Sequence, residues 1–376
     1  LGLTYIAAAL IKNGHKVKLL DRNITSLKNR FDLSVVDKQT ISEITSFSPD
    51  IIGFSATTPS MHDVKYFSGI VRKIMPDKKL ILGGAHPTIE PDESLRICKA
   101  IDIVVRGEGE RTIVNLVNNL DKLSDFKGIT FREGENIISN EDVEQISNLD
   151  DIPMPRRDLL DMDFYCKPMI ARGLYGRFTT IFTSRGCYGR CNFCAGYKVF
   201  TGCVRYHSPE RVLSEIEEII SRYKVDYLYF AEDEFLSNRK RAEELCALLI
   251  KKNINKKIKW IAQIRPEKNR VNKELVKLVQ RAGCVQLEIG FESGSQEELD
   301  RMNKRAKVED YYYITRLLRE AGMRFQANFI LRYPGQTMED LAKTISLIKD
   351  SRASLVQANA FWALPGSRAY EELEEK

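Results

Sequence analysis

The stretch Phe178-Thr-Thr-Ile-Phe-Thr-Ser-Arg-Gly-Cys187-Tyr-Gly-Arg-Cys191-Asn-Phe-Cys194 joins an apolar run to three closely spaced cysteines. The apolar run predicts a strand that delivers the cysteine loop. Thiolates are soft ligands that suit iron–sulfur clusters or zinc. A structural zinc site takes four protein ligands, whereas three thiolates on a four-iron cluster leave one iron open. The spacing therefore favours an iron–sulfur centre, and the alternative is a zinc site completed by Cys203.

The sequence from Arg177 onward alternates strand and helix patterns in six strand–helix units. The expected strands cover 178–183, 227–231, 258–264, 284–292, 324–331 and 353–362. The expected helices cover 209–223, 239–251, 273–282, 308–321 and 338–348. This repeat predicts an open, partial (β/α)6 barrel, a segment of a TIM barrel, with active residues at the carboxyl ends of its strands.

The first 120 residues alternate in the same way and predict an α/β, doubly wound (Rossmann-like) parallel sheet. We expect strands at 15–21, 50–56, 79–84 and 102–106, and helices at 1–13, 41–46, 61–74, 92–99 and 112–120. Polar or glycine-rich loops at 55–60, 83–88 and 107–110 follow three of the strands. Ligands of such sheets bind at the carboxyl ends of strands. The alternative is that these glycines only make tight turns.

The composition argues against several classes of protein. The 376 residues carry a net charge of +6, which by itself does not indicate nucleic acid. No run approaches the ~18 apolar residues of a membrane-spanning helix. Eight cysteines, three of them clustered, fit a reducing, cytoplasmic compartment and an oxygen-sensitive metal site better than a disulfide framework. The chain opens within a helical pattern without methionine, so we expect a fragment whose first strand and C-terminal region are missing.

The cysteine spacing, with an aromatic residue before the last cysteine, resembles the radical S-adenosylmethionine (SAM) superfamily. That resemblance implies a 4Fe–4S cluster on Cys187, Cys191 and Cys194, whose open iron chelates SAM and whose reduction cleaves it to a 5′-deoxyadenosyl radical. It also implies SAM contacts at the ends of successive strands: Phe193, Glu232, Asp233, Glu234, Gln263, Arg265, Glu292, Ser293 and Asn328. One departure is Leu331-Arg-Tyr-Pro-Gly-Gln-Thr337, where Arg332 replaces a glycine and Gln336 a glutamate of the family pattern.

Four N-terminal motifs resemble the cobalamin-binding domain that precedes many radical SAM domains. They are Leu1-Gly-Leu-x-Tyr-Ile-Ala-Ala, Gly14-His-x-Val, Gly83-Gly-Ala-His-Pro-Thr and Gly107-Glu-Gly-Glu110. The resemblance implies cobalamin contacts from Ser55, Thr57, Thr58, Gly83, Gly84, His86, Thr88, Gly107, Glu108, Gly109 and Glu110. No histidine follows the Asp-x-His pattern of cobalt-ligating domains, so we expect His86 to lie near the corrin without binding cobalt.

Together the two resemblances imply a cobalamin-binding domain at 1–125, a hairpin and linker at 126–175, and a radical SAM domain at 176–376. They imply an enzyme that methylates an unactivated carbon of a small-molecule substrate, with cobalamin as methyl carrier and a flavodoxin- or ferredoxin-like protein as external electron donor. The alternatives are an oxidative ring cyclase of the tetrapyrrole type, an RNA methylthiotransferase and a non-catalytic corrinoid-binding or sensing protein. The region before Cys187 holds only Cys98 and Cys166, which argues against the methylthiotransferase.

Overall fold

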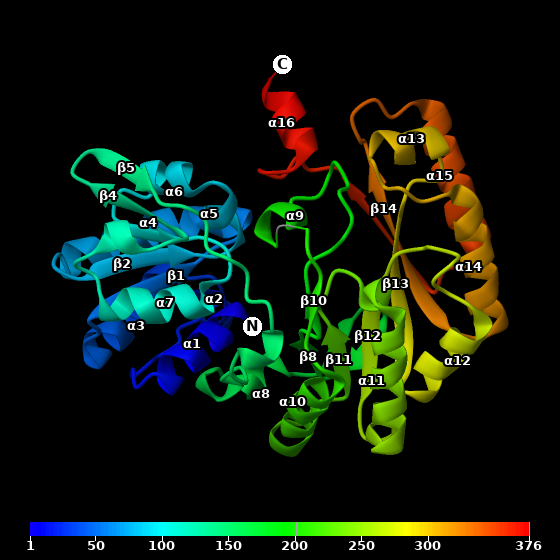
Figure 1. Ribbon diagram of the computed structural model, residues 1–376, viewed down its shortest axis with the longest axis horizontal. Helices are drawn as coiled ribbons and strands as arrows, with labels where there is room; N and C mark the ends of the chain where they lie inside the picture. The colour runs from blue at the N-terminus through cyan, green and yellow to red at the C-terminus, as the bar shows by residue number, and fades with distance from the viewer. Residues whose placement is uncertain (201, 376) are drawn as a thin grey trace. The chain divides into compact units, whose positions relative to one another are not determined.

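The structure is a computed structural model that describes residues 1–200 and 202–375 (Figure 1). Thr201 and Lys376, the last residue of the expected C-terminal domain, lie outside this description. The chain divides into two compact units. The first comprises residues 1–147 and 151–161, and the second comprises 148–150 and the chain from Met162 onward.

A five-stranded sheet in the order β1-β2-β3-β4-β5 forms the first unit. β1 (Ile51–Ser55), β2 (Lys79–Gly83) and β3 (Ile103–Val105) are parallel, as predicted. β4 (Ile129–Glu133) and β5 (Asn136–Ser139) form a hairpin that continues the sheet in the antiparallel sense, because β4 pairs with β3. The hairpin expected within the connecting region is therefore part of this sheet.

Helices cover both faces of this sheet, as a doubly wound fold requires. Leu80, Leu82 and Val104 pack in one apolar cluster with α4 and α6, whereas the alternate residues Ile81 and Ile103 pack in another with α7. Figure 1 shows α4 and α6 on one side of the strands and α7 with α1 on the other. The helices are α1 (Gly2–Lys12), α2 (Arg22–Lys28), α3 (Leu33–Phe47), α4 (Met61–Ile74), α5 (Ala85–Ile89), α6 (Pro91–Ile97) and α7 (Gly109–Asn118).

The prediction of a strand at His15–Asp21 was wrong. This segment has no regular secondary structure, although its side chains alternate in exposure as a strand's would. A strand exists only where a neighbouring chain segment completes its hydrogen bonds. Among the described residues no strand pairs with this segment, so it forms no ladder even though β1 lies at the edge of the sheet. The described strands also follow one another in sequence order, without a reversal.

The second unit contains a six-stranded, wholly parallel sheet in the order β15-β14-β13-β12-β11-β8. Its strands are β8 (Phe178–Ile181), β11 (Tyr227–Phe230), β12 (Lys259–Ile264), β13 (Cys284–Glu292), β14 (Arg324–Leu331) and β15 (Leu355–Ala360). Between them lie α10 (Pro209–Arg222), α11 (Arg239–Lys251), α12 (Lys273–Arg281), α13 (Gln296–Arg301), α14 (Val308–Glu320) and α15 (Met338–Ser351). All six predicted strands and five predicted helices are confirmed, and the sheet is the expected partial barrel.

Short elements complete the second unit. They are the hairpin of β6 (Met169–Ala171) and β7 (Leu174–Gly176), the pair β9 (Ser184–Arg185) and β10 (Arg205–Tyr206), and the helices α8 (Met162–Tyr165), α9 (Gly196–Val199) and α16 (Arg368–Glu374). Among the described residues, no helix has both the length and the apolar character needed to cross a membrane.

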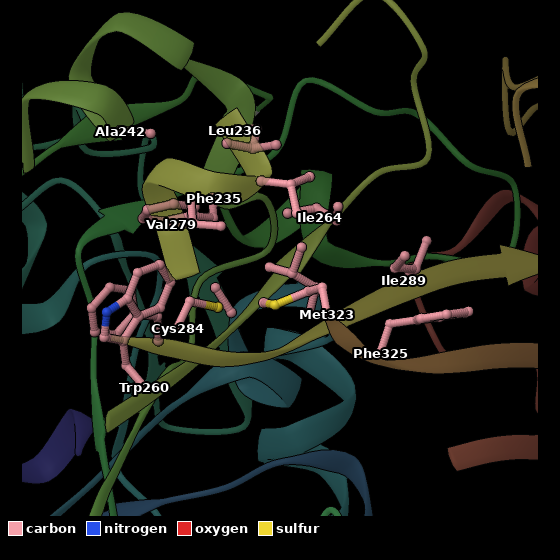
Figure 2. Packing of buried hydrophobic residues seen from close by; sticks show 14 of the residues in the cluster. Phe235, Leu236, Ala242, Trp260, Ile264, Val279, Cys284, Ile289, Met323 and Phe325 are labelled. Carbon is pink, nitrogen blue, oxygen red and sulfur yellow. The ribbon is translucent and has the colours of Figure 1, made fainter. Parts of the chain in front are cut away.

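Alternation along the strands separates the core from the inside of the barrel. Leu287, Ile289 and Phe291 of β13 join the large apolar core beneath the helices, and Figure 2 shows Trp260, Cys284, Met323 and neighbouring side chains meeting in that core. The alternate residues of β13 are polar and face the other side, as successive side chains of a strand must. The residue pattern of these strands therefore buries one face under helices and leaves the other to bind polar groups.

Candidate functional site

The three cysteines of the Cys187–Cys194 loop are supported by backbone and side-chain donors. The amides of Gly189 and Gly196 each lie 3.3 Å from a sulfur, that of Cys187 and of Cys194 respectively. The guanidinium of Arg265 lies 3.6 Å from the sulfur of Cys191. Such donors stabilise thiolates and are the usual surroundings of cluster ligands.

The segment after α13 holds this loop in place. The amide of Asn192 donates to the carbonyl of Met302 at 2.8 Å, and the side chain of Asn303 donates to the carbonyl of Arg190 at 2.7 Å. The ring of Phe193 packs beside Met302, and its centroid lies 5.8 Å from the ammonium of Lys304. The cysteine loop is thus tied to a segment more than 100 residues away in the sequence.

Two of the three thiols, those of Cys187 and Cys194, have raised pKa values. Burial raises the pKa of Cys187, and it raises the pKa of Cys194 to about 11. Cluster binding must therefore displace these protons. Among the described residues no three His, Cys, Asp or Glu side chains surround a single metal position. A four-iron cluster binds each thiolate at a different iron, and a single loop with three supported sulfurs fits it.

The acidic motif after β11 divides into one open carboxylate and two internal ones. Glu232 is buried and accepts hydrogen bonds from Thr183 and, at 3.1 Å, from Ser184. Glu234 is buried, accepts from the amides of Leu236 and Arg265, and has a pKa raised to about 7, chiefly by burial. Both glutamates thus bond to the protein's own loops, while Oε1 of Glu232 is buried without a partner among the described residues, and their contacts with SAM through backbone or carboxylate stay a prediction.

Asp233 is the carboxylate of this motif that stays open to a ligand. Its side chain is exposed, yet surrounding protein removes enough hydration to raise its pKa. It is close enough to Cys187 and Cys194 to interact electrostatically with both. A carboxylate in this position can accept hydrogen bonds from an ammonium group held beside the cluster.

Glu292 ends β13 at a bulge, in the left-handed region with φ of 65°. Its Oε1 accepts a hydrogen bond from the Lys304 ammonium at 2.7 Å, and both side chains are almost fully buried. Among the described residues Oε2 of Glu292 has no hydrogen-bond partner. Gly290 is required here, because a Cβ at that position would lie 2.4 Å from Oε1 of Glu292. The bulge therefore presents one oxygen of Glu292 to a ligand and fixes the other.

Three further predicted SAM residues have protein partners. Ser293 is fully buried, and its hydroxyl donates to Glu298 at 2.6 Å. Gln263 lies 3.5 Å from the carboxylate of Glu288 inside the barrel, and Asn328 accepts from Gln326 at 2.7 Å. Gln263 and Asn328 are partly exposed on the polar face, where they remain candidates for a ligand.

Several residues that shape this site were not indicated by any sequence motif. Lys304 follows no strand and belongs to no motif, so only the fold brings it to Glu292. Glu288 lies inside the barrel and accepts from Tyr229 at 3.3 Å and from Arg172, whose guanidinium lies 3.7 Å from the ring centroid of Tyr229. The polar alternation of β13 was the available signal for Glu288, and nothing local pointed to Arg172 in the β6–β7 turn.

The first unit brings three predicted loops together at the carboxyl ends of β1, β2 and β3. Oγ1 of Thr58 lies 3.1 Å from Nδ1 of His86, which joins the first loop to the second. Oγ1 of Thr88 accepts from the amide of Gly107 at 3.0 Å, which joins the second to the third. Ser55, Thr57, Thr58 and Gly107 are exposed along this edge. Their open hydroxyl and backbone groups fit a polar ligand.

Other residues of the three loops face the protein. His86 is buried, and burial lowers its pKa, so the imidazole is neutral. Its Nε2 has no partner within the described residues. Glu108 accepts from the amide of Ile146 at 2.9 Å, and Glu110 is buried in α7. Both glutamates are buried, and their expected contacts with cobalamin stay a prediction.

The three remaining glycines differ in what fills the space beside them. A Cβ on Gly84 would lie 2.4 Å from the carbonyl oxygen of Ala56, whereas a Cβ on Gly83 would meet only the carbonyl of Val105 at 3.6 Å. Gly109 opens α7, and a Cβ there would lie 3.1 Å from Cδ1 of Ile6. Close packing against Ala56 therefore explains the glycine at position 84, and Gly83 leaves room for an approaching group.

Comparison with known proteins identifies both units. Residues 181–348 match the model of the radical SAM superfamily, and residues 1–117 match that of the B12 binding domain. An uncharacterized methyltransferase of Pyrococcus horikoshii is 31% identical over 99% of this chain and 77% of its own length. The anaerobic magnesium-protoporphyrin IX monomethyl ester cyclase of Cereibacter sphaeroides is 30% identical over 89% of this chain, which spans 55% of that relative.

A solved structure has the same fold as the whole chain. The radical SAM methyltransferase TsrM from Kitasatospora setae, with cobalamin and a [4Fe–4S] cluster bound, superposes with a TM-score of 0.81 at 16% identity. The match covers 100% of this chain and 71% of TsrM. Cofactors of this class are a 4Fe–4S cluster, SAM and cobalamin, and its members are enzymes. The chain belongs to the family of radical SAM enzymes that carry an N-terminal cobalamin-binding domain.

Proposed function

We propose that this chain transfers a methyl group to an unactivated carbon of a small-molecule substrate. The observation that carries the proposal is the presence, in one chain, of a supported three-thiol loop and a domain that matches the B12 binding model. The resemblance to an uncharacterized methyltransferase over 99% of the chain supports it. When bound, SAM at the cluster supplies a radical that removes a hydrogen atom, and cobalamin supplies the methyl group.

Different residues of the second unit bind the cluster and the different parts of SAM. Cys187, Cys191 and Cys194 hold the cluster as thiolates. Asp233 accepts from the amino group of SAM, because its carboxylate is open and lies near two of the three sulfurs. Glu292 accepts from the ribose hydroxyls through Oε2, while Lys304 holds Oε1 at 2.7 Å and keeps the carboxylate oriented.

The residues of the first unit bind the corrin through exposed hydroxyls and backbone. Ser55, Thr57 and Thr58 follow β1, and Gly83 and Gly107 let the backbone approach a ligand. We propose that His86 orients Thr58 through their 3.1 Å contact and does not itself bind cobalt. The expected domain division at 1–125, 126–175 and 176–376, a cytoplasmic location and a flavodoxin- or ferredoxin-like electron donor remain parts of this proposal.

The decisive experiment follows both products of SAM. The protein is reconstituted anaerobically with iron, sulfide and hydroxocobalamin, reduced, and supplied with SAM and candidate substrates. Methyl transfer by this scheme yields S-adenosylhomocysteine and 5′-deoxyadenosine in equal amounts, because one SAM donates a methyl group and another is cleaved. Failure to bind any corrinoid at full iron content would remove the basis of the proposal.

An oxidative ring cyclase is the second candidate. It is favoured by the 30% identity to the cyclase of Cereibacter sphaeroides, which is close to the identity with the methyltransferase relative. The same experiment separates the two functions. A cyclase cleaves SAM to 5′-deoxyadenosine without methylating its substrate, so 5′-deoxyadenosine formed without S-adenosylhomocysteine would favour it.

A further inference from the structure

Arg265 contacts a cluster cysteine, although its position after β12 suggested a SAM contact. Its Nη1 donates toward the sulfur of Cys191 at 3.6 Å, and the residue is only 7% exposed. A cation with so little exposure is weakly screened by water, so its charge acts strongly on neighbouring groups. The side chain is thus placed to act on the cluster's ligands.

The other nitrogens of the guanidinium are already engaged. Nε donates to Glu267 at 3.1 Å, and Nη2 donates to the carbonyl of Lys304. The ring centroid of Tyr188, the residue after Cys187, lies 5.4 Å from the guanidinium carbon. The hydroxyl of Tyr188 also donates to Glu267 at 2.7 Å. These contacts hold the guanidinium in one orientation and leave Nη1 directed at the cysteine loop.

Gly189 shows how closely the guanidinium approaches that loop. A Cβ on Gly189 would lie 2.7 Å from Nη1 of Arg265 and 3.4 Å from the sulfur of Cys187. The guanidinium therefore lies against the backbone between Cys187 and Cys191. The absence of a side chain at position 189 is what permits this approach.

The physical effect of such a group on an iron–sulfur cluster has a definite sign. Reduction adds one electron to a centre that already carries three thiolates, so the reduced form is one unit more negative. A nearby buried cation and an N–H···S hydrogen bond both stabilise the more negative form, and hydrogen bonds to sulfur and net charge are known determinants of cluster potential.

We propose that Arg265 is a positioning residue that raises the reduction potential of the cluster through its hydrogen bond to Cys191 and its charge. The reaction concerned is the transfer of one electron to the oxidised cluster from a low-potential one-electron donor. The inference rests on the family's cluster and not on the identity of the transferred group. A failed methyl-transfer assay therefore leaves it intact.

The test is a redox titration of the reconstituted protein, without SAM, in which the reduced cluster is followed by electron paramagnetic resonance. Arg265→Gln should lower the equilibrium constant for reduction at least tenfold, which corresponds to about 59 mV for one electron. Gly189→Ala keeps the charge and pushes the guanidinium away, so it should lower the potential by less. Arg270→Gln is the matched control, because Arg270 binds the same Glu267 at 2.6 Å but has no contact with sulfur.

Each outcome of the redox titration either supports or contradicts the proposal. A lowered potential in Arg265→Gln with about four irons per chain, and a shift in Arg270→Gln of less than half that size, support the proposal. An unchanged potential in Arg265→Gln, or an equal shift in Arg270→Gln, overturns it. If Arg265→Gln does not retain iron, Gly189→Ala decides, and an unchanged potential in that variant also overturns the proposal.

Discussion

Gly84→Ala probes how the loops of the cobalamin-binding unit are held together. Gly84 has φ of 111° and ψ of −176°, a region that essentially only glycine occupies. A methyl group there would also lie 2.4 Å from the oxygen and 2.8 Å from the nitrogen of Ala56, which are backbone atoms of the neighbouring loop. The amide of His86 donates to that same Ala56 oxygen at 3.3 Å.

Two costs add in this variant. Backbone strain in a region reserved for glycine costs about 1–3 kcal/mol. Forcing a methyl group into a filled space costs about 1–3 kcal/mol more. We therefore expect a local destabilisation of about 4 kcal/mol. Because about 1.36 kcal/mol is a factor of ten, that loss corresponds to roughly a thousandfold change in the opening equilibrium of these loops.

Hydrogen exchange measures this opening locally, which matters in a chain of two units whose unfolding need not be a single transition. Peptides covering residues 51–60 and 79–90 should exchange up to a thousandfold faster in Gly84→Ala, and corrinoid binding should weaken. Gly53→Ala is the control, because Gly53 lies in β1 with nothing within 4 Å of its Cβ position. Protection in Gly84→Ala within about threefold of that control would refute the steric reasoning.

Three further predictions concern the second unit. Cys191→Ala should lose the cluster and all cleavage of SAM. Iron content and the amount of 5′-deoxyadenosine formed measure these losses, and full cleavage by the variant would contradict the site assignment. Glu292→Ala should weaken SAM binding in calorimetry while iron is kept, and should destabilise the fold by about 3 kcal/mol because it leaves Lys304 buried without its partner. The added substitution Lys304→Met should restore much of that stability but not the binding. His207→Gln should flatten the loss of stability on acidification between about pH 6.5 and 4.

The sign of the last prediction follows from His207 itself. Burial lowers its pKa to about 4, while Asp150, 3.0 Å from Nδ1, opposes that shift. Between about pH 6.5 and 4 the unfolded chain takes up a proton that the folded chain does not, so stability falls as pH falls. The difference amounts to about 3 kcal/mol. Equal pH slopes of unfolding free energy in the wild type and His207→Gln, measured without cofactors, would contradict this reasoning.

Much of the fold followed from local sequence. The pattern of Cys284–Glu292 predicted a strand, and the structure has that strand, with Leu287, Ile289 and Phe291 in the apolar core and Glu288 on the other face. The segment His15–Asp21 shows the limit of such patterns. Its alternation satisfies a strand, yet strand formation depends on a hydrogen-bonding neighbour that local sequence does not specify.

Some features of the candidate site could likewise be predicted from local sequence, and others could not. The three cysteines could be recognised as ligands from the sequence because all three lie in one loop. The sequence did not show which carboxylate of Glu232–Asp233–Glu234 stays open to a ligand. That depends on Thr183, Ser184 and the amide of Arg265, which lie in other segments of the chain.

Strand periodicity and ligand spacing are local properties, so the sequence alone indicated two α/β units and an iron–sulfur centre, and the resemblance of its motifs to known families implied SAM and cobalamin. Tertiary structure alone decided that Arg265 meets the sulfur of Cys191, that Lys304 pairs with Glu292, and that Gly84 makes room for Ala56. These contacts join residues 12 to 74 positions apart. Their partners are selected by packing of the whole unit, so no local pattern encodes them.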